Sequence, residues 1–170
     1  MGADKAELLW LGQRAVDRIV RLAGECGSEL VVTAGSNDYG YPYVVDDILG
    51  GGPVGGILAG ARVLLSASCR RALILAVDAP MVERGNLTPL LQAEPPGAAF
   101  EHVHLPMVLD LLAIPEVAVA GWPIARLIER AGLLRIPCPM QHIDSMRGAN
   151  TPEEHQEQLR RLNMSNSEGR

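Results

Sequence analysis

Short aliphatic runs alternate with segments of helical spacing along the first half of the chain, and this alternation restricts the fold more than any other feature. The runs are residues 30–34, 43–45 and 72–77, and each is bounded by Gly, Pro, Arg or Asp. We expect all three to be buried strands. Helical spacing of apolar residues appears over 11–23 and 57–65. The pattern predicts right-handed βαβ units in an α/β fold, with a mainly parallel sheet and helices on both faces.

The pattern is looser after Asp78. Residues 83–93 have helical spacing, with Pro89 near the predicted start, and a turn follows at residues 94–97. Residues 98–102 and 105–109 are expected to be two strands of a β-ribbon, or the second is the start of a helix.

The last third contains two predicted helices and one strand. A helix over residues 123–131 is expected to end at Gly132, followed by a strand over 133–136. Thr151, Pro152 and Glu154 form the pattern of a helix start, with Thr151 as N-cap and Glu154 closing a capping box. That helix is expected to run to about Leu162.

A length of 170 residues fits one domain, and neither an internal repeat nor a linker divides the sequence. We therefore expect a single domain over residues 1–162. The polar residues 163–170 are predicted to be a disordered tail.

The charge and aromatic content argue against a nucleic-acid partner. The chain has 15 basic and 20 acidic residues, a net charge of −5, an aromatic share of 4%, and no basic run. Nucleic-acid binders use a basic footprint or aromatic stacking platforms, and both are missing from the sequence.

Apolar run lengths and cysteine positions indicate a cytoplasmic protein without a membrane partner. The central apolar run, residues 72–77, is much shorter than the roughly 18 residues needed to span a bilayer. Residues 8–11 are too short an apolar block for a signal peptide. Cys26, Cys69 and Cys138 are widely spaced and form no C-x-x-C pair, so a disulfide framework or zinc site is not expected.

Lys5 is the first candidate for phosphate chemistry, because it follows a glycine and precedes a predicted helix. Asp46 and Asp47 are the second, since they follow a predicted strand and precede a glycine-rich stretch over residues 50–56. Acids at a strand end, glycines and a helix N-terminus together make a place for a nucleotide. The alternatives are a solvated lysine and a flexible turn with two solvated acids.

Asp78 is the third candidate, since it follows the most hydrophobic predicted strand. A carboxylate at the carboxyl end of such a strand is well placed to hold Mg²⁺ together with substrate phosphates. The alternative is that Asp78 is a structural N-cap for the next segment. His102 and His104 are not expected to hold a metal, because no third ligand accompanies them.

Four motifs occur in order: M-G-x-D-K-A, then D-x-x-x-x-x-G-P-x-x-G-G, then V-D-A-P, then N-T-P-E-E. This order resembles the molybdenum cofactor guanylyltransferases, within the nucleotidyltransferases that make molybdenum cofactor dinucleotides. The resemblance implies a Rossmann-like fold that uses Mg²⁺ and GTP to attach GMP to the terminal phosphate of molybdopterin, with release of pyrophosphate. It also implies contacts with other cofactor-biosynthesis proteins or molybdoenzymes.

The resemblance implies roles for individual residues. Lys5 would neutralise GTP phosphates and Asp78 would hold Mg²⁺. Gly52, Pro53 and Gly56 would form the loop beside the guanine, with either Asp46 or Asp47 as its acidic partner. Asn150, in the fourth motif, would be a ligand contact.

The sequence departs from the family pattern at two places. The family signature begins with a strand leading into L-A-G-G-x-S-x-R, whereas this sequence starts at Met1 within that signature. We expect either a start codon placed too far downstream or a short form with a damaged sheet and little transfer activity. In addition, Gly148 stands where relatives often carry Asn in N-x-N-T-P.

Three functions remain open on the sequence: transfer of GMP to molybdopterin, transfer of CMP or another nucleotide by the same fold, and nucleotide binding without catalysis. Upstream in-frame codons for the missing signature would favour an enzyme, and stop codons there would favour the non-catalytic protein.

Overall fold

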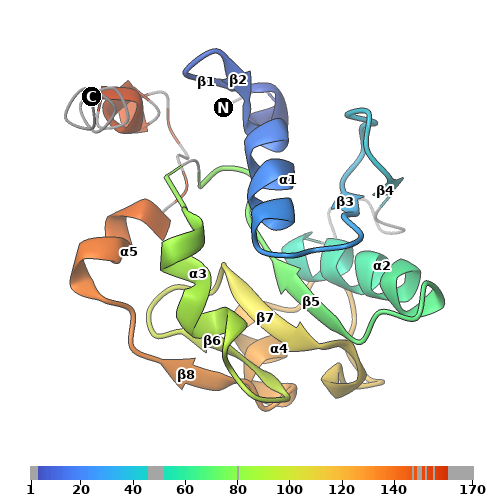
Figure 1. The fold of residues 1–170 in the computed structure, drawn as a ribbon. Helices are drawn as coiled ribbons and strands as arrows, with labels where there is room; N and C mark the ends of the chain where they lie inside the picture. The colour runs from blue at the N-terminus through green and yellow to red at the C-terminus, as the bar shows by residue number, and fades with distance from the viewer. Residues whose placement is uncertain are drawn as a thin grey trace.

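The computed structural model describes residues 4–45, 52–79, 81–146, 148, 151, 153–154 and 156–160 (Figure 1). Strands and helices alternate over most of this length. The elements are η1 (Lys5–Glu7), β1 (Leu9–Trp10), β2 (Gln13–Arg14), α1 (Ala15–Glu25), β3 (Thr33–Ala34), β4 (Tyr43–Val44), α2 (Gly52–Ser66), β5 (Arg71–Ile74), α3 (Arg84–Leu91), β6 (Gly97–Phe100), β7 (Met107–Asp110), η2 (Leu111–Ala113), α4 (Ile124–Arg130), β8 (Leu134–Ile136) and α5 (Met140–Met146).

The largest sheet has the strand order β5-β7-β6-β8. Strand β7 is antiparallel to both neighbours, and β6 is parallel to β8. The predicted α/β class is confirmed, but the prediction of a mainly parallel sheet is wrong for these strands. The connection over residues 101–106 is too short for the crossover that parallel neighbours need, so β6 and β7 pair as the predicted antiparallel ribbon.

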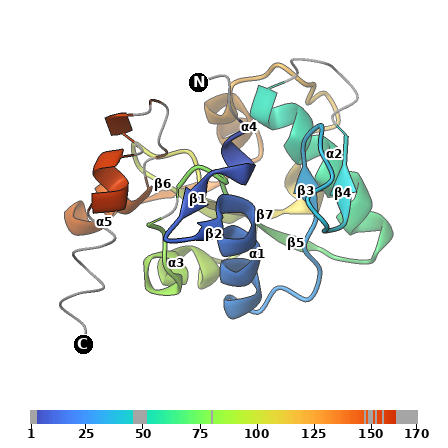
Figure 2. The ribbon, with the colours of Figure 1, turned by 90° about the horizontal axis from the view of Figure 1, so that it is seen from above.

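Helices cover both faces of this sheet, as predicted. Ala98, Phe100 and Val108 pack with residues of α1 and α3, whereas Ala99 and Met107 pack with residues of α2 and α4. The alternation follows from the two-residue period of a strand. Figure 2 shows α1 and α3 on one side of the strands and α2 and α4 on the other.

Strands β3 and β4 form a separate parallel pair beside α2 (Figure 1). Both occur within the predicted runs, but they are shorter than expected, and Ala34 and Tyr43 are exposed. The prediction that these runs are buried is therefore wrong. Among the described strands, β3 pairs with β4 alone, so it lies outside the larger sheet. Ala34 is therefore not covered by a neighbouring strand of that sheet and stays exposed.

Helix α1 begins at Ala15 rather than at residue 11. Strands β1 and β2 form a hairpin before it, with Leu11 and Gly12 at φ values of 53° and 78°. Two successive residues with positive φ make the two-residue turn that best matches strand twist, so the chain reverses before the helix starts.

The other predicted elements differ mainly in length. β5 ends at Ile74 instead of residue 77, and α2 begins within the glycine-rich stretch, at Gly52. Pro89 lies inside α3, not near its start, and α5 was not predicted. Helix α4, strand β8 and the turn at Gly132, with a φ of 70°, agree with the prediction.

The predicted capping box near the C-terminus is confirmed. The Glu154 N–H donates to Thr151 Oγ1, and the Thr151 N–H donates to the Glu154 carboxylate, each over 3.1 Å. Residues 153–154 and 156–160 are helical. The predicted tail, residues 163–170, and Leu162 lie outside the described residues, so the domain boundary stays a prediction.

Candidate functional site

Lys5 and Asp78, predicted separately, form an ion pair. The Lys5 Nζ donates to Asp78 Oδ2 over 2.7 Å, across 73 residues of sequence. The side chains are 33% and 21% exposed, so both are accessible from solvent and partly shielded. Lys5 is also the only lysine of the chain. The fold therefore places a cation and a carboxylate together after the end of β5.

Asp4 holds Lys5 in position through the short helix η1. Its Oδ1 accepts a hydrogen bond from the Ala6 N–H over 3.0 Å, which caps η1. Its Oδ2 accepts from Asn37 Nδ2 over 2.7 Å and from the Tyr39 hydroxyl over 2.8 Å. Burial alone would raise the pKa of Asp4, but hydrogen bonds from Tyr39, Ala6 and Asn37 hold it below its ordinary value.

The loop over residues 35–41, which carries Asn37 and Tyr39, is anchored to α1 by a second carboxylate, that of Asp17. Asp17 accepts two hydrogen bonds from the Arg14 guanidinium, over 2.8 and 2.7 Å, and one from the Tyr41 hydroxyl over 2.9 Å. Arg14 also donates to the Tyr39 carbonyl over 3.1 Å. The Arg14 guanidinium holds the pKa of Asp17 below its ordinary value, against the effect of burial, with help from Tyr41.

Sequence reasoning missed the anchoring role of Asp4 and did not identify the loop over residues 35–41. Asp4 is part of the M-G-x-D-K-A motif, which was the available signal. Asn37 and Tyr39 carried no comparable signal, because their role depends on which segment the loop packs against.

Gly52, Pro53 and Gly56 lie at the start of α2, and with Asp78 they line one cavity of 520 Å³. Gly52 has a φ of 66°, a value that glycine adopts without strain. A Cβ on Gly56 would come within 3.1 Å of the Ala34 Cβ, so the glycine lets α2 approach β3 closely. The structure thus brings four of the predicted residues around one cavity, with Lys5 bonded to one of them.

Asp46, Asp47 and Asn150 lie outside the described residues, so their predicted roles stay predictions. The alternative role of Asp78 as a helix cap is not observed, since the N-cap of α3 is Glu83.

Gly148 packs directly against Asp78. A Cβ on residue 148 would come within 2.5 Å of Oδ1, 2.6 Å of Cγ and 2.7 Å of Oδ2. The glycine at position 148 therefore leaves room for the Asp78 carboxyl group.

The donor set at Asp78 limits how a metal could be held. Among the described residues, no group of three or more His, Cys, Asp or Glu side chains could hold a metal ion. One carboxylate fits a Mg²⁺ ion whose other ligands are water and substrate phosphates, which is the usual arrangement for magnesium bound with nucleotides.

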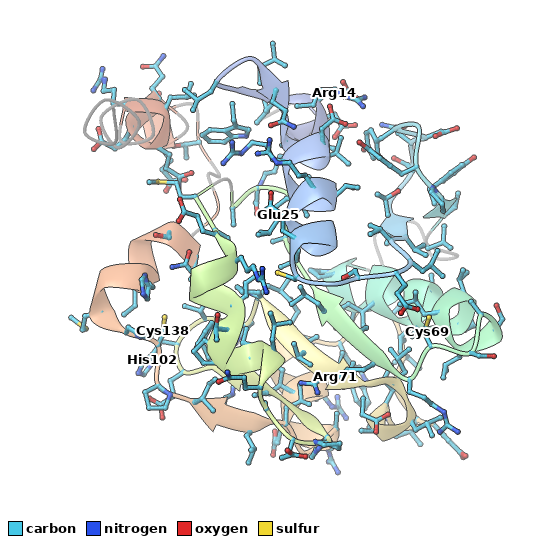
Figure 3. All side chains as sticks on the ribbon, viewed as in Figure 1. Arg14, Glu25, Cys69, Arg71, His102 and Cys138 are labelled. Carbon is cyan, nitrogen blue, oxygen red and sulfur yellow. The ribbon has the colours of Figure 1, made fainter. Side chains whose placement is uncertain are left out.

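Figure 3 shows Arg14, at the site end of α1, far from Arg71 at the start of β5 and from Cys69. Cys26, Cys69 and Cys138 are free thiols in the structure. Within the described ranges, every helix is too short or too polar to cross a membrane.

Comparison with known proteins supports the predicted family. Residues 1–130 match the MobA-like NTP transferase domain. A probable molybdenum cofactor guanylyltransferase from Opitutus terrae is 34% identical over 88 residues, which are 49% of this chain and 44% of that protein. The molybdenum cofactor guanylyltransferase of Xanthomonas euvesicatoria pv. vesicatoria is 34% identical over 113 residues, or 65% and 58% of the two chains. The match thus spans about half the length of these curated relatives.

A solved structure confirms the fold at low identity. The molybdopterin-guanine dinucleotide biosynthesis protein A of Archaeoglobus fulgidus superimposes with a TM-score of 0.71 at 19% identity, over 98% of this chain and 92% of that one. The match over residues 1–130 covers well over half of the sequence. The chain belongs to the MobA-like NTP transferase family.

Proposed function

We propose that this protein transfers GMP from GTP to the terminal phosphate of molybdopterin and releases pyrophosphate. The observation that carries the proposal is the Lys5–Asp78 ion pair, 2.7 Å long, after the end of β5 and beside the cavity lined by Gly52, Pro53 and Gly56. Family membership and the names of the relatives support the same reaction.

The reaction joins two anions, so positive charge and positioning are its main requirements. An oxygen of the molybdopterin phosphate forms a bond to the α-phosphorus of GTP. The bond from that phosphorus to the oxygen shared with the β-phosphate breaks, and pyrophosphate leaves with the electron pair. A phosphate is already a nucleophile at neutral pH, so the reaction needs no serine or cysteine nucleophile.

Lys5 supplies a fixed positive charge for the triphosphate. Its ammonium group is held by Asp78, and η1 is held by Asp4, so the charge is positioned before the substrate arrives. Positioning in advance lowers the cost of reaching the transition state, because little reorganisation is left to do.

Asp78 would hold Mg²⁺, which supplies further positive charge to the phosphates when bound. The described hydrogen bond of Asp78 uses Oδ2. The N-terminal turn of α2, with Gly52 and Gly56, allows the backbone to approach a nucleotide closely. We assign Asp46 or Asp47 to the guanine base and Asn150 to a ligand contact by the resemblance alone, and we expect the protein in the cytoplasm.

The test is pyrophosphate release from molybdopterin and each of GTP, CTP, ATP and UTP in the presence of Mg²⁺. Turnover with GTP at least tenfold above the others is expected, and equal or greater turnover with CTP would contradict the choice of base. Absence of turnover with every nucleotide, in a protein that still binds GTP, would favour the non-catalytic alternative.

Variants connect this activity to the two residues. K5A and D78N are each expected to lower kcat/KM by about 100-fold or more, in line with the loss of one charged contact to a transferring phosphate. K5R keeps the charge and should restore part of the activity. E116Q is the control. Glu116 is exposed and lies outside the helices and strands, so its substitution should leave kcat/KM unchanged. D78N with full activity in saturating Mg²⁺ would remove the metal role.

The single lysine allows a chemical test that does not depend on turnover. An amine-reactive reagent can modify Lys5 and the terminal amine, and mass spectrometry of the peptides separates the two sites. GTP is expected to slow modification of Lys5 at least fivefold and to leave the terminal amine unchanged. No protection by GTP would place the triphosphate away from Lys5.

A further inference from the structure

A second cavity, of 380 Å³, lies between α1 and the start of α3 and contains none of the residues assigned to the candidate site. Figures 1 and 2 both show these two helices side by side. The charged residues that line it are Arg18, Arg21 and Glu25 of α1, and Glu83 and Arg84 at the start of α3. We call this cavity the arginine pocket. Its volume is at the lower end of the range for small-molecule sites, so it suits a small ligand.

The sequence of α1 places its charged lining residues on one face of the helix. Arg18, Arg21 and Glu25 are spaced by three and four residues, which is the spacing of neighbours on a helix surface. Leu22, on the same face, packs with Val82 in the core, and both also line the pocket. The charged side chains therefore border an apolar floor.

The lining of the arginine pocket carries more positive than negative charge, with three guanidinium groups and two carboxylates. Burial lowers the pKa of Arg18, and the charge of Arg21 lowers it further, whereas Glu83 and Glu25 act in the opposite direction. The charged form of Arg18 is thus less favoured here than in water. An anion in the pocket would offset the cost of burial and the repulsion between the two arginines.

The two carboxylates leave the arginines able to take an anion. Arg21 Nε lies 3.6 Å from Glu25 Oε1, and these side chains are 56% and 53% exposed. A long ion pair in solvent contributes little, so a multiply charged anion can replace Glu25 as the partner of Arg21. Glu83 is exposed and is the N-cap residue of α3.

Helix α3 adds backbone donors to the pocket. Arg84 and Gly85 are its first two residues, and both line the cavity. The first four N–H groups of a helix have no carbonyl partner within the helix, and the helix dipole favours an anion there. Guanidinium groups bind two phosphate oxygens at once. Together the three arginines and these donors match the chemistry of phosphate.

We propose that the arginine pocket binds a diphosphate group, held between Arg21 of α1 and Arg84 of α3, with Arg18 as the third cation. A single phosphate group carries a charge of about −1.5 to −2 at pH 7, so three guanidinium groups have capacity for a second one. The ligand links α1 to α3. This binding site goes beyond nucleotide transfer and does not depend on it.

The first measurement is the Tm of the full chain with inorganic pyrophosphate, in buffer without Mg²⁺. An increase of about 5–10 °C is expected at a concentration about 100 times Kd. The affinity is expected to fall at least threefold between about 50 and about 300 mM NaCl, because salt screens the charges. No increase in Tm at about 10 mM pyrophosphate would overturn the proposal.

A double variant tests the two exposed arginines of the pocket. R21Q/R84Q is expected to weaken pyrophosphate binding at least tenfold. The matched control is R70Q/R130Q, which also removes two exposed arginines, neither of which lines the pocket. Equal weakening by both double variants would show general attraction to a charged surface and would overturn the proposal.

Glu25 provides a test in the opposite direction. E25Q keeps the size of the side chain but removes a negative charge from the pocket and the partner of Arg21. Pyrophosphate is therefore expected to bind at least threefold more tightly to E25Q than to the wild type. Weaker binding to E25Q would contradict the proposed position of the anion.

Pyrophosphate is also the product of the proposed reaction, so K5A separates the two sites. K5A is expected to bind pyrophosphate within threefold of the wild type. If K5A abolishes binding and R21Q/R84Q keeps it, the anion belongs to the candidate site and the proposal is wrong.

The diphosphate can be free or part of a nucleotide, and GDP distinguishes these sources. Weaker binding of both GDP and pyrophosphate to R21Q/R84Q would identify the diphosphate of a nucleotide. Weaker binding of pyrophosphate alone would identify a free diphosphate. Each result supports the arginine pocket, whereas a double variant that binds both ligands as the wild type does would overturn it.

Discussion

The backbone of Gly148 lies against the carboxyl group of Asp78, with room for no side chain between them: a Cβ on residue 148 would come within 2.5 Å of Asp78 Oδ1. These residues are 70 positions apart, so only the tertiary structure brings them together. Since Asp78 is also bonded to Lys5, a change at Gly148 affects the whole ion pair.

G148A is expected to displace the Asp78 carboxyl and to lower kcat/KM by about tenfold or more, because misplaced charges lose much of their effect on a transferring phosphate. G148N, which introduces a larger side chain at the same place, should have a larger effect. Both are measured by pyrophosphate release, with thermal unfolding as a check on folding. G24A is the control, since a Cβ there meets no atom. Unchanged activity of G148N would show that the backbone moves to make room.

The pH dependence of stability should reflect Asp4 and Asp17, whose pKa values lie below the ordinary 3.8. A carboxyl group with a lowered pKa stabilises the folded state above its unfolded pKa, and this contribution is lost as pH falls through the folded pKa. We therefore expect the free energy of unfolding to fall as pH drops below about 4. Urea unfolding between pH 7 and 3 measures this.

D17N provides the matched variant for the pH experiment. It weakens the bonds from Arg14 and Tyr41, and because the Asp17 side chain is partly exposed we expect a loss of about 1 kcal/mol at pH 7. The loss should become smaller as pH falls from the unfolded pKa of Asp17 through its lowered folded pKa, because protonation then removes the advantage of the wild-type carboxylate. E116Q, at an exposed position, should follow the wild type. A loss for D17N that does not change with pH would point to packing instead of charge.

The two tyrosines of the loop are expected to differ in function although each bonds a carboxylate. Y39F removes the bond to Asp4, next to Lys5, whereas Y41F removes the bond to Asp17 in α1. Each should cost about 0.5–1 kcal/mol of unfolding free energy, the lower part of the range for a typical hydrogen bond, because both pairs are open to solvent. Only Y39F should raise the KM for GTP. Equal effects of both variants on KM would mean that the loop acts as one unit.

Phe100, the only phenylalanine, is the last residue of β6 and is fully buried against the helices α1 and α3. F100A is expected to cost about 3–5 kcal/mol of unfolding free energy, from lost burial and the cavity left behind. L112A is the control, because Leu112 is 59% exposed and its loss should change stability by less than about 0.5 kcal/mol. Denaturant unfolding measures both. A cost below about 1 kcal/mol for F100A would mean that the core closes over the space.

Local patterns explain which elements could be predicted. Helix α4 and its stop at Gly132, the ribbon of β6 and β7, and the capping box at Thr151 each depend on residues close together in sequence. The start of α1 was missed because the turn at Leu11 and Gly12 competes with helical spacing over the same residues. The exposure of Ala34 in β3 was also not predicted, since burial depends on which strands lie beside a strand.

The sequence by itself determined the residue types at the candidate site: one lysine near the N-terminus, an aspartate after an aliphatic strand, and glycines at a helix start. These are local choices of charge and backbone freedom, so motif order was enough to indicate a nucleotidyltransferase. Only the tertiary structure decided that Lys5 bonds Asp78, that Asn37 and Tyr39 hold the Asp4 carboxylate next to Lys5, and that Gly52, Pro53, Gly56 and Asp78 line one cavity. Those relationships join residues tens of positions apart, and they arise from how the helices and strands pack, which no local pattern specifies.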